Sequence, residues 1–149
     1  MEASIKKIIL ATDFSDTSKD ASSHALLLAK NYKAELKVLH VFDIMAQSIP
    51  SHDYFATDAV VEGLEETIQR GKDTLLELEK SFDLEVETIF TEGDPGHEIV
   101  RVAEELNADL IVLGTHGYKG WKRFTIGSVA ELVVRRAPCA VLTIRPKGK

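Results

Sequence analysis

The sequence predicts an α/β fold in which an open, five-stranded parallel sheet carries helices on both faces. Two observations predict it. Strand-like apolar runs alternate with amphipathic helical patterns along the whole chain. The run Leu-Ile-Val-Leu at 110–113 is also continuously apolar, which is typical of a parallel strand buried on both faces. A chain of 149 residues is ordinary for one such fold, so we expect a single domain over residues 1–149.

The first half of the chain supplies two predicted strands, over residues 5–11 and 35–42. Between them, apolar residues three and four positions apart predict a helix over 16–32. Its inward face carries Ala21, Ala25, Leu28, Ala29 and Tyr32. Residues 43–56 are expected to form a loop. A long helix over 57–81 follows, with Leu64, Ile68, Leu75 and Leu78 along one side.

The second half continues the alternation. A strand is expected over residues 84–90, and Gly93-Asp94-Pro95 ends it. Asp94 is predicted to cap the next helix, with Pro95 in its first turn. The buried stripe of that helix is Ile99, Val102, Ala103 and Leu106. The strand at 110–113, a helix over 128–137 and a strand over 139–144 complete the chain.

Right-handed crossovers between these strands favour a Rossmann-like sheet with the strand order 3-2-1-4-5. In open sheets of this kind, ligands bind beyond the carboxyl ends of the strands, where the strand order reverses. We therefore expect residues 11–13 and 114–117, which follow the first and fourth strands, to face each other across one crevice.

Glycines mark the second side of that crevice. Gly114 and Gly117 follow the fourth strand, where a missing side chain lets the backbone approach a ligand. Gly127-Ser128 then opens a helix, whose free N–H groups and dipole favour an anion. These residues outline a phosphate cradle. Ser128 with Glu131 three residues later is also a capping box, which would satisfy the same N–H groups.

Composition and charge narrow the class of protein. The net charge is −6, and an acidic body disfavours general nucleic-acid binding. Residues 114–136 are locally basic, which suits a small anionic ligand. The apolar runs are too short for a membrane span, and a single cysteine excludes an internal disulfide. We expect a soluble, cytoplasmic protein.

The sequence resembles the universal stress protein family over almost its whole length. Gly114, Gly117, Gly127 and Ser128 complete the family pattern of glycine, two residues, glycine, nine residues, glycine, then serine or threonine. Further segments match in order: Thr12-Asp13-Phe14-Ser15, Glu92-Gly93-Asp94-Pro95, Ala108-Asp109-Leu110-Ile111-Val112 and Arg136-Ala137-Pro138-Cys139-Ala140-Val141-Leu142. One departure is Ala11, where nucleotide-binding relatives often carry proline.

The resemblance implies ATP binding, because family members with the full glycine pattern bind it. It implies that Asp13, with the backbone near Ala11 and Thr12, holds the ribose and adenosine, and that the main chain of Val41 meets the adenine. It implies that Gly114, His116 and Gly117 lie along the ribose and the first phosphates. The outer phosphates would then meet Gly127, Ser128 and Val129. Any Mg²⁺ would be held by the phosphates. Asp13 could instead start a turn or cap the first helix, and His116 could be only a loop residue.

The order of strands leaves two sheet edges. Glu85 and Glu87 would protect the third strand from edge pairing, whereas Ala140 to Ile144 carry no such charge. A homodimer joined through this last strand would cover the apolar edge, in agreement with the family's usual arrangement. Between the second and third glycines lie Tyr118, Trp121, Phe124 and Ile126, which could pack on the sheet, join a subunit contact or cover the nucleotide.

We therefore expect a nucleotide-responsive stress protein with weak or no ATPase activity. No Gly-x4-Gly-Lys-Ser/Thr motif supplies a P-loop lysine, and no evident general base or nucleophile–histidine pair accompanies the glycines. The alternative is a dimeric interaction module with a vestigial nucleotide site. A pyrophosphatase-type ligase ranks lower, because Ala-Thr-Asp-Phe-Ser-Asp stands where such enzymes carry a Ser-Gly-Gly-x-Asp-Ser loop.

Overall fold

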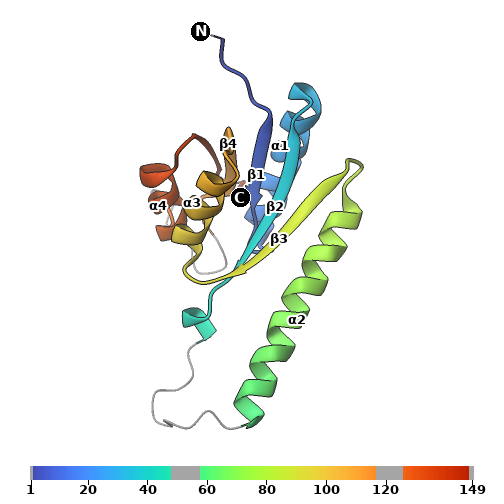
Figure 1. The fold of residues 1–149 in the computed structure, drawn as a ribbon, viewed down its shortest axis with the longest axis vertical. Helices are drawn as coiled ribbons and strands as arrows, with labels where there is room; N and C mark the ends of the chain where they lie inside the picture. The colour runs from blue at the N-terminus through green and yellow to red at the C-terminus, as the bar shows by residue number, and fades with distance from the viewer. Residues whose placement is uncertain (1, 48–57, 117–125, 148–149) are drawn as a thin grey trace.

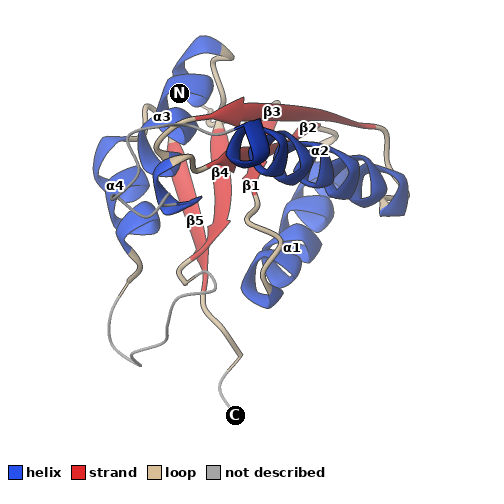
Figure 2. Ribbon diagram, turned by 90° about the horizontal axis from the view of Figure 1, so that it is seen from below, coloured by secondary structure: helices blue, strands red, loops and turns tan. Residues whose placement is uncertain are grey.

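The computed structural model describes residues 2–47, 58–116 and 126–147. Five parallel strands form one sheet in the order β3-β2-β1-β4-β5, which confirms the predicted fold class (Figure 1; β5 is labelled in Figure 2). The strands are β1 (Lys7–Ala11), β2 (Glu35–Phe42), β3 (Val86–Glu92), β4 (Leu110–Gly114) and β5 (Ala140–Ile144). The helices are α1 (Asp16–Tyr32), α2 (Asp58–Ser81), α3 (Pro95–Glu105) and α4 (Ser128–Arg136), with a short 3₁₀ helix, η1 (Met45–Gln47), after β2.

Helices cover the sheet on both sides, with α1 and α2 on one face and α3 and α4 on the other (Figure 2). The alternation of side chains along β1 shows the division. Ile8 and Leu10 pack in the cluster that contains α1 and α2 residues, whereas Ile9 and Ala11 pack in the cluster that contains α3 and α4 residues. All four are buried because the central strand is covered twice.

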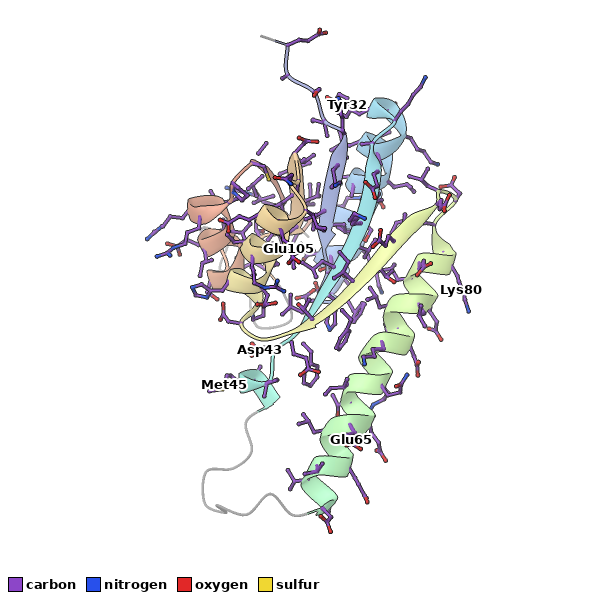
Figure 3. The ribbon with its side chains drawn as sticks, in the orientation of Figure 1. Tyr32, Asp43, Met45, Glu65, Lys80 and Glu105 are labelled. Carbon is purple, nitrogen blue, oxygen red and sulfur yellow. The ribbon has the colours of Figure 1, made fainter. Side chains whose placement is uncertain are left out.

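Local capping fixes where the helices begin. Ser15 caps α1, and its Oγ accepts a hydrogen bond from the backbone N–H of Ser18 at 3.3 Å. Asp94 caps α3 in the same way through His97 N, with Pro95 in the first turn, as the sequence predicted. The prediction for Tyr32 is wrong: this residue is 53% exposed, at the last position of α1 (Figure 3).

Two strands begin two residues later than predicted. β1 begins at Lys7, two residues late, because the Asp109 carboxylate accepts the N–H groups of Lys6 and Lys7. β3 is shifted by two residues, since it pairs with β2 as far as Phe42. Glu85 therefore lies outside the edge strand, and Glu87 contacts Lys37 on β2. No helix within the described ranges is both long and apolar enough to cross a membrane.

Candidate functional site

A cavity of about 480 Å³ lies at the carboxyl edge of the sheet, beyond the ends of β1, β2 and β4. The strand order reverses between β1 and β4, so the connections that leave these two strands run to opposite sides of the sheet. In an open parallel sheet, a crevice forms between two such strands at their carboxyl ends. Its volume is in the range of small-molecule sites. β1, β2 and β3 run downward in Figure 1, and Asp43 and Met45 mark the end of β2 at this edge in Figure 3.

Every predicted site residue that the structure describes lies on this cavity. They are Ala11, Thr12, Asp13, Val41, Gly114, His116, Gly127, Ser128 and Val129. The loop after β1 and the loop after β4 thus share one crevice, as expected from the strand order. Gly117, Tyr118, Trp121 and Phe124 lie outside the described residues.

The first side of the cavity, which we call the carboxylate end, consists of Thr12, Asp13 and His40. Asp13 is exposed, and its Oδ1 accepts hydrogen bonds from Ser15 N at 3.0 Å and Ser18 Oγ at 2.6 Å. Ser15, not Asp13, caps α1. One carboxylate oxygen therefore holds the turn, and Oδ2 has no partner among the described residues. Both roles considered for Asp13, turn and ligand, are compatible with this geometry.

His40 holds the turn from the neighbouring strand. Its ring Nδ1 lies 2.8 Å from the carbonyl oxygen of Thr12. The ring stacks on Phe14 at a centroid distance of 4.3 Å and lies 5.7 Å from Phe90. Burial lowers the pKa of His40, while the Thr12 carbonyl and the Asp13 charge act in the opposite direction. Neutral imidazole is therefore the favoured form at neutral pH.

The second side, which we call the amide end, consists of residues 114–116 and 127–129. Two glycines shape it through close approaches within the protein. A Cβ on Gly114 would lie 2.7 Å from Thr17 Cγ2, and a Cβ on Gly127 would lie 2.6 Å from the Thr115 carbonyl oxygen. The Gly127 N–H donates to that same oxygen at 2.7 Å. Gly114 therefore leaves room for the Thr17 side chain, and Gly127 lets two backbone segments of the site approach each other.

The start of α4 corrects one sequence expectation. Gly127 is the N-cap, and Ser128 is the first helical residue, so the predicted capping box of Ser128 with Glu131 does not form. The Glu131 carboxylate instead accepts from Arg135 at 2.8 Å. The N–H groups of Ser128 and Val129 precede the first intrahelical donor, Glu131 N, and have no partner among the described residues. They are donors for an anion in the cavity.

His116 adds a polar group to the amide end. Its ring Nδ1 lies 2.9 Å from Thr115 Oγ1, and its Nε2 is buried without a hydrogen-bond partner within the described part of the chain. Thr115 is itself fixed, since its N–H donates to the Ile144 carbonyl at 2.9 Å. A buried, unpaired ring nitrogen beside free N–H groups favours a polar ligand at this end.

The structure adds site residues that the sequence analysis missed. They include Ser18, His40, Asp43, Pro95, Ile99 and Thr115. A usable signal was present for Asp43 and Thr115, because both follow directly on the carboxyl ends of strands. His40 gave no such signal. It lies inside β2, and its side chain reaches the loop of another strand.

The titratable groups on the described lining are few. The carboxylates are Asp13 and Asp43, the imidazoles are His40 and His116, and none of these described lining residues is a lysine or arginine. Asp43 Oδ1 accepts from Met45 N and Ala46 N at 3.1 Å each, which fixes the start of η1 at the rim. The site therefore offers carboxylate acceptors at one end and neutral N–H donors at the other.

Comparison with known proteins connects this geometry to a family. The sequence model of the universal stress protein family matches residues 4–145. Universal stress protein MJ0531 of Methanocaldococcus jannaschii is 36% identical over 145 residues, covering 97% of this chain and 84% of that protein. The structure of MJ0577 from the same organism is similar, with a TM-score of 0.81 and 28% identity over 97% of this chain and 99% of the other. A universal stress protein in complex with cAMP shares the fold, with a TM-score of 0.61 and 24% identity over 96% and 98% of the two chains.

Proposed function

The chain belongs to the universal stress protein family, and from this premise we propose that it binds ATP at the carboxyl edge of its sheet. The adenine would lie against the main chain of Val41, the ribose hydroxyls at Asp13, and the phosphates at Ser128 and Val129. The protein would respond to stress through occupancy of this site.

One observation carries the proposal: one end of the cavity offers a hydrogen-bond acceptor and the other offers N–H donors, and the ribose and the phosphates of ATP need these two kinds of partner. The Asp13 carboxylate can accept from ribose hydroxyls, which are donors. The N–H groups at the start of α4 can donate to phosphate oxygens, and the helix dipole favours their negative charge. The complete glycine pattern, which by family resemblance implies ATP binding, and the cAMP complex of a distant relative support the same class of ligand.

We propose binding with at most slow hydrolysis. The described lining lacks a lysine or arginine to stabilise charge on a transferred phosphoryl group. Asp13 is the candidate general base at the carboxylate end. Its Oδ1 already accepts hydrogen bonds from Ser15 and Ser18, so this oxygen is not available to activate a water molecule. Mg²⁺ carried by the phosphates would neutralise part of their charge. Protein free of contaminating ATPases that turns over ATP many times per second would contradict this part of the proposal.

The first experiment is mass spectrometry of small molecules released from gently purified protein, followed by calorimetric titration with ATP. We expect an adenine nucleotide among the released molecules and a saturable heat of binding. Absence of both results would favour the alternative, a dimeric interaction module with a vestigial site. The capping box of Ser128 with Glu131 was the sequence observation that favoured this alternative, and the structure does not form it.

A matched pair of variants at Ser128 separates the phosphate contact from helix stability. Ser128→Pro removes the N–H, and the fold tolerates it because Gly127 has an extended ψ of 155° and proline is favoured in the first helical turn. Ser128→Ala removes only the hydroxyl. We expect Ser128→Pro to weaken ATP binding about tenfold or more, the cost of one hydrogen bond to a charged group, without lowering the thermal midpoint.

We also propose that the protein is a cytoplasmic homodimer joined through β5, which is an edge of the sheet. Ile144 O accepts from Thr115, so alternation along a parallel strand directs the Thr143 N–H away from β4. Thr143→Pro should then yield monomers in light scattering, while Thr143→Val should remain dimeric. A wild-type monomer would overturn this proposal.

A further inference from the structure

We propose that His40 is a positioning residue of the nucleotide site, which places the Asp13 carboxylate by holding the Thr12 carbonyl and the Phe14 ring. The proposal rests on the proposed function for its ligand, and it adds a residue outside the glycine pattern. In this proposal β2 contributes a side chain that holds the Asp13 turn, in addition to the main chain of Val41 that would meet the adenine.

The hydrogen bond from His40 has only one possible direction. The Thr12 carbonyl can only accept, so the ring Nδ1 at 2.8 Å carries the proton and donates. The Thr12 N–H donates in turn to the Leu39 carbonyl at 2.9 Å. Both sides of this residue are therefore fixed by β2, the next strand of the sheet. Asp13 is attached directly to a carbonyl that His40 restrains.

The turn that follows needs such a restraint. Phe14 has a φ of +65°, a left-handed conformation that is uncommon for a residue with a large side chain. Strained backbone of this kind persists where the surroundings over-determine it. Here the His40 ring stacks on Phe14 with an interplanar angle of 28°, while Phe14 N donates to Thr12 Oγ1 at 3.1 Å. Removing the imidazole would release contacts on both sides of Asp13.

The far side of the ring connects the site to the opposite face of the sheet. His40 lies near Phe90 on β3, and a Cβ on Gly71 of α2 would lie 3.9 Å from its Nε2. The ring is therefore enclosed by β3 and α2 and has little freedom to turn away from Thr12. The contact that fixes the loop is built into the packing of the sheet.

Two substitutions separate the donor from the ring. His40→Phe keeps an aromatic ring between Phe14 and Phe90 but removes the donor. His40→Asn keeps a side-chain N–H close to the position of Nδ1 but removes the ring. Calorimetry with ATP and with 2′,3′-dideoxy-ATP then tests whether the donor acts through Asp13, because only ATP offers ribose hydroxyls to that carboxylate.

We expect His40→Phe to weaken ATP binding by about three- to tenfold, the range for one intramolecular hydrogen bond, and to leave the affinity for 2′,3′-dideoxy-ATP unchanged. His40→Asn should bind ATP more tightly than His40→Phe. Equal losses for both nucleotides in His40→Phe, or unchanged ATP affinity, would overturn the inference while leaving ATP binding itself intact.

A second measurement tests the inference even if the wild-type protein binds no ATP, which would overturn the proposed function alone. Amide hydrogen exchange at Asp13 and Ser15 in the ligand-free protein should accelerate in His40→Phe and stay closer to wild type in His40→Asn. Equal protection of these amides in all three proteins would show that His40 does not position the turn.

Discussion

The carboxylate end and the amide end of the cavity are built from different parts of the polypeptide. At the carboxylate end, side chains do the positioning: Asp13 is held by Ser15 and Ser18, and Thr12 by His40. At the amide end, the unpaired backbone N–H groups belong to Ser128 and Val129, which line the cavity, and Gly127 fixes the chain through its own N–H. The carboxylate end therefore depends on particular side chains, whereas the amide end depends on glycines, which have no side chain.

This difference sets how each end responds to substitution. A side-chain network weakens by one hydrogen bond at a time, so conservative replacements have graded effects. A backbone site changes little on most side-chain replacements, but it fails when a Cβ or a proline alters the main chain. Substitutions at the two ends should therefore differ in size and in the ligand group that they affect.

The largest effect is expected at Gly127. Its Cβ in Gly127→Ala would lie 2.6 Å from a backbone oxygen, so the chain must move. A displacement of this kind can reduce function about a hundredfold, and we expect a comparable loss of ATP affinity by calorimetry. Gly63→Ala is the control, since nothing lies within 4 Å of its Cβ on α2. It should leave ATP affinity unchanged and raise stability by about 1 kcal/mol. Unchanged binding in Gly127→Ala would contradict the close approach.

Substitution of Gly114 should mainly lower the stability of the protein. In Gly114→Ala the new Cβ would lie 2.7 Å from Thr17 Cγ2, and overpacking of this kind costs about 1–3 kcal/mol in the free energy of unfolding. Adding Thr17→Ser removes the methyl group and should restore part of the loss, as measured by urea denaturation. If the double variant is as unstable as Gly114→Ala, the Thr17 contact is not the reason for this glycine.

Asp13 tests the carboxylate end. Asp13→Asn keeps the oxygen that accepts from Ser15 and Ser18 and replaces the second oxygen with an NH₂ donor. We expect ATP and adenosine affinity to fall together by about tenfold, the cost of one charged hydrogen bond. Thermal unfolding should stay close to wild type, whereas Asp13→Ala should also lower it. A loss confined to ATP, with adenosine affinity unchanged, would contradict the assignment of Asp13 to the ribose.

The smallest effect concerns pH. Burial lowers the pKa of His40 below its ordinary value of 6.5, against the Thr12 carbonyl and the nearby Asp13 charge, while Lys72 lies over the adjacent Phe90 ring. The unfolded chain binds the His40 proton more readily than the folded protein does. The contribution of neutral His40 to the free energy of unfolding is therefore fully present above pH 6.5 and is lost as the pH falls toward the folded pKa. The free energy of unfolding of the wild type should therefore decline more between about pH 7 and 5 than that of His40→Asn. Parallel pH profiles would contradict this linkage.

The sequence predicted the sheet and its order because the apolar alternation is strong and the crossover rules leave few topologies. The described residues that it assigned to the site all line one cavity, because the ends of β1, β2 and β4 and the start of α4 meet at one edge of the sheet. Their contact with a nucleotide stays a prediction. The sequence did not predict the contact between His40 and Thr12, which joins residues 28 positions apart. Nor did it predict the true cap of α4. Ser128 and Glu131 have capping-box spacing, which would start the helix after Ser128, whereas Gly127 is the N-cap and Ser128 is the first helical residue.

The central claim is that the carboxylate end holds the ribose and the amide end holds the phosphates. Calorimetric titration of wild type, Asp13→Asn and Ser128→Pro with both adenosine and ATP tests it most directly. We predict that Asp13→Asn weakens both ligands by the same factor, whereas Ser128→Pro weakens ATP alone and leaves adenosine unchanged. If Ser128→Pro weakens adenosine as much as ATP, or if neither variant alters ATP binding, the assignment of the two ends is wrong.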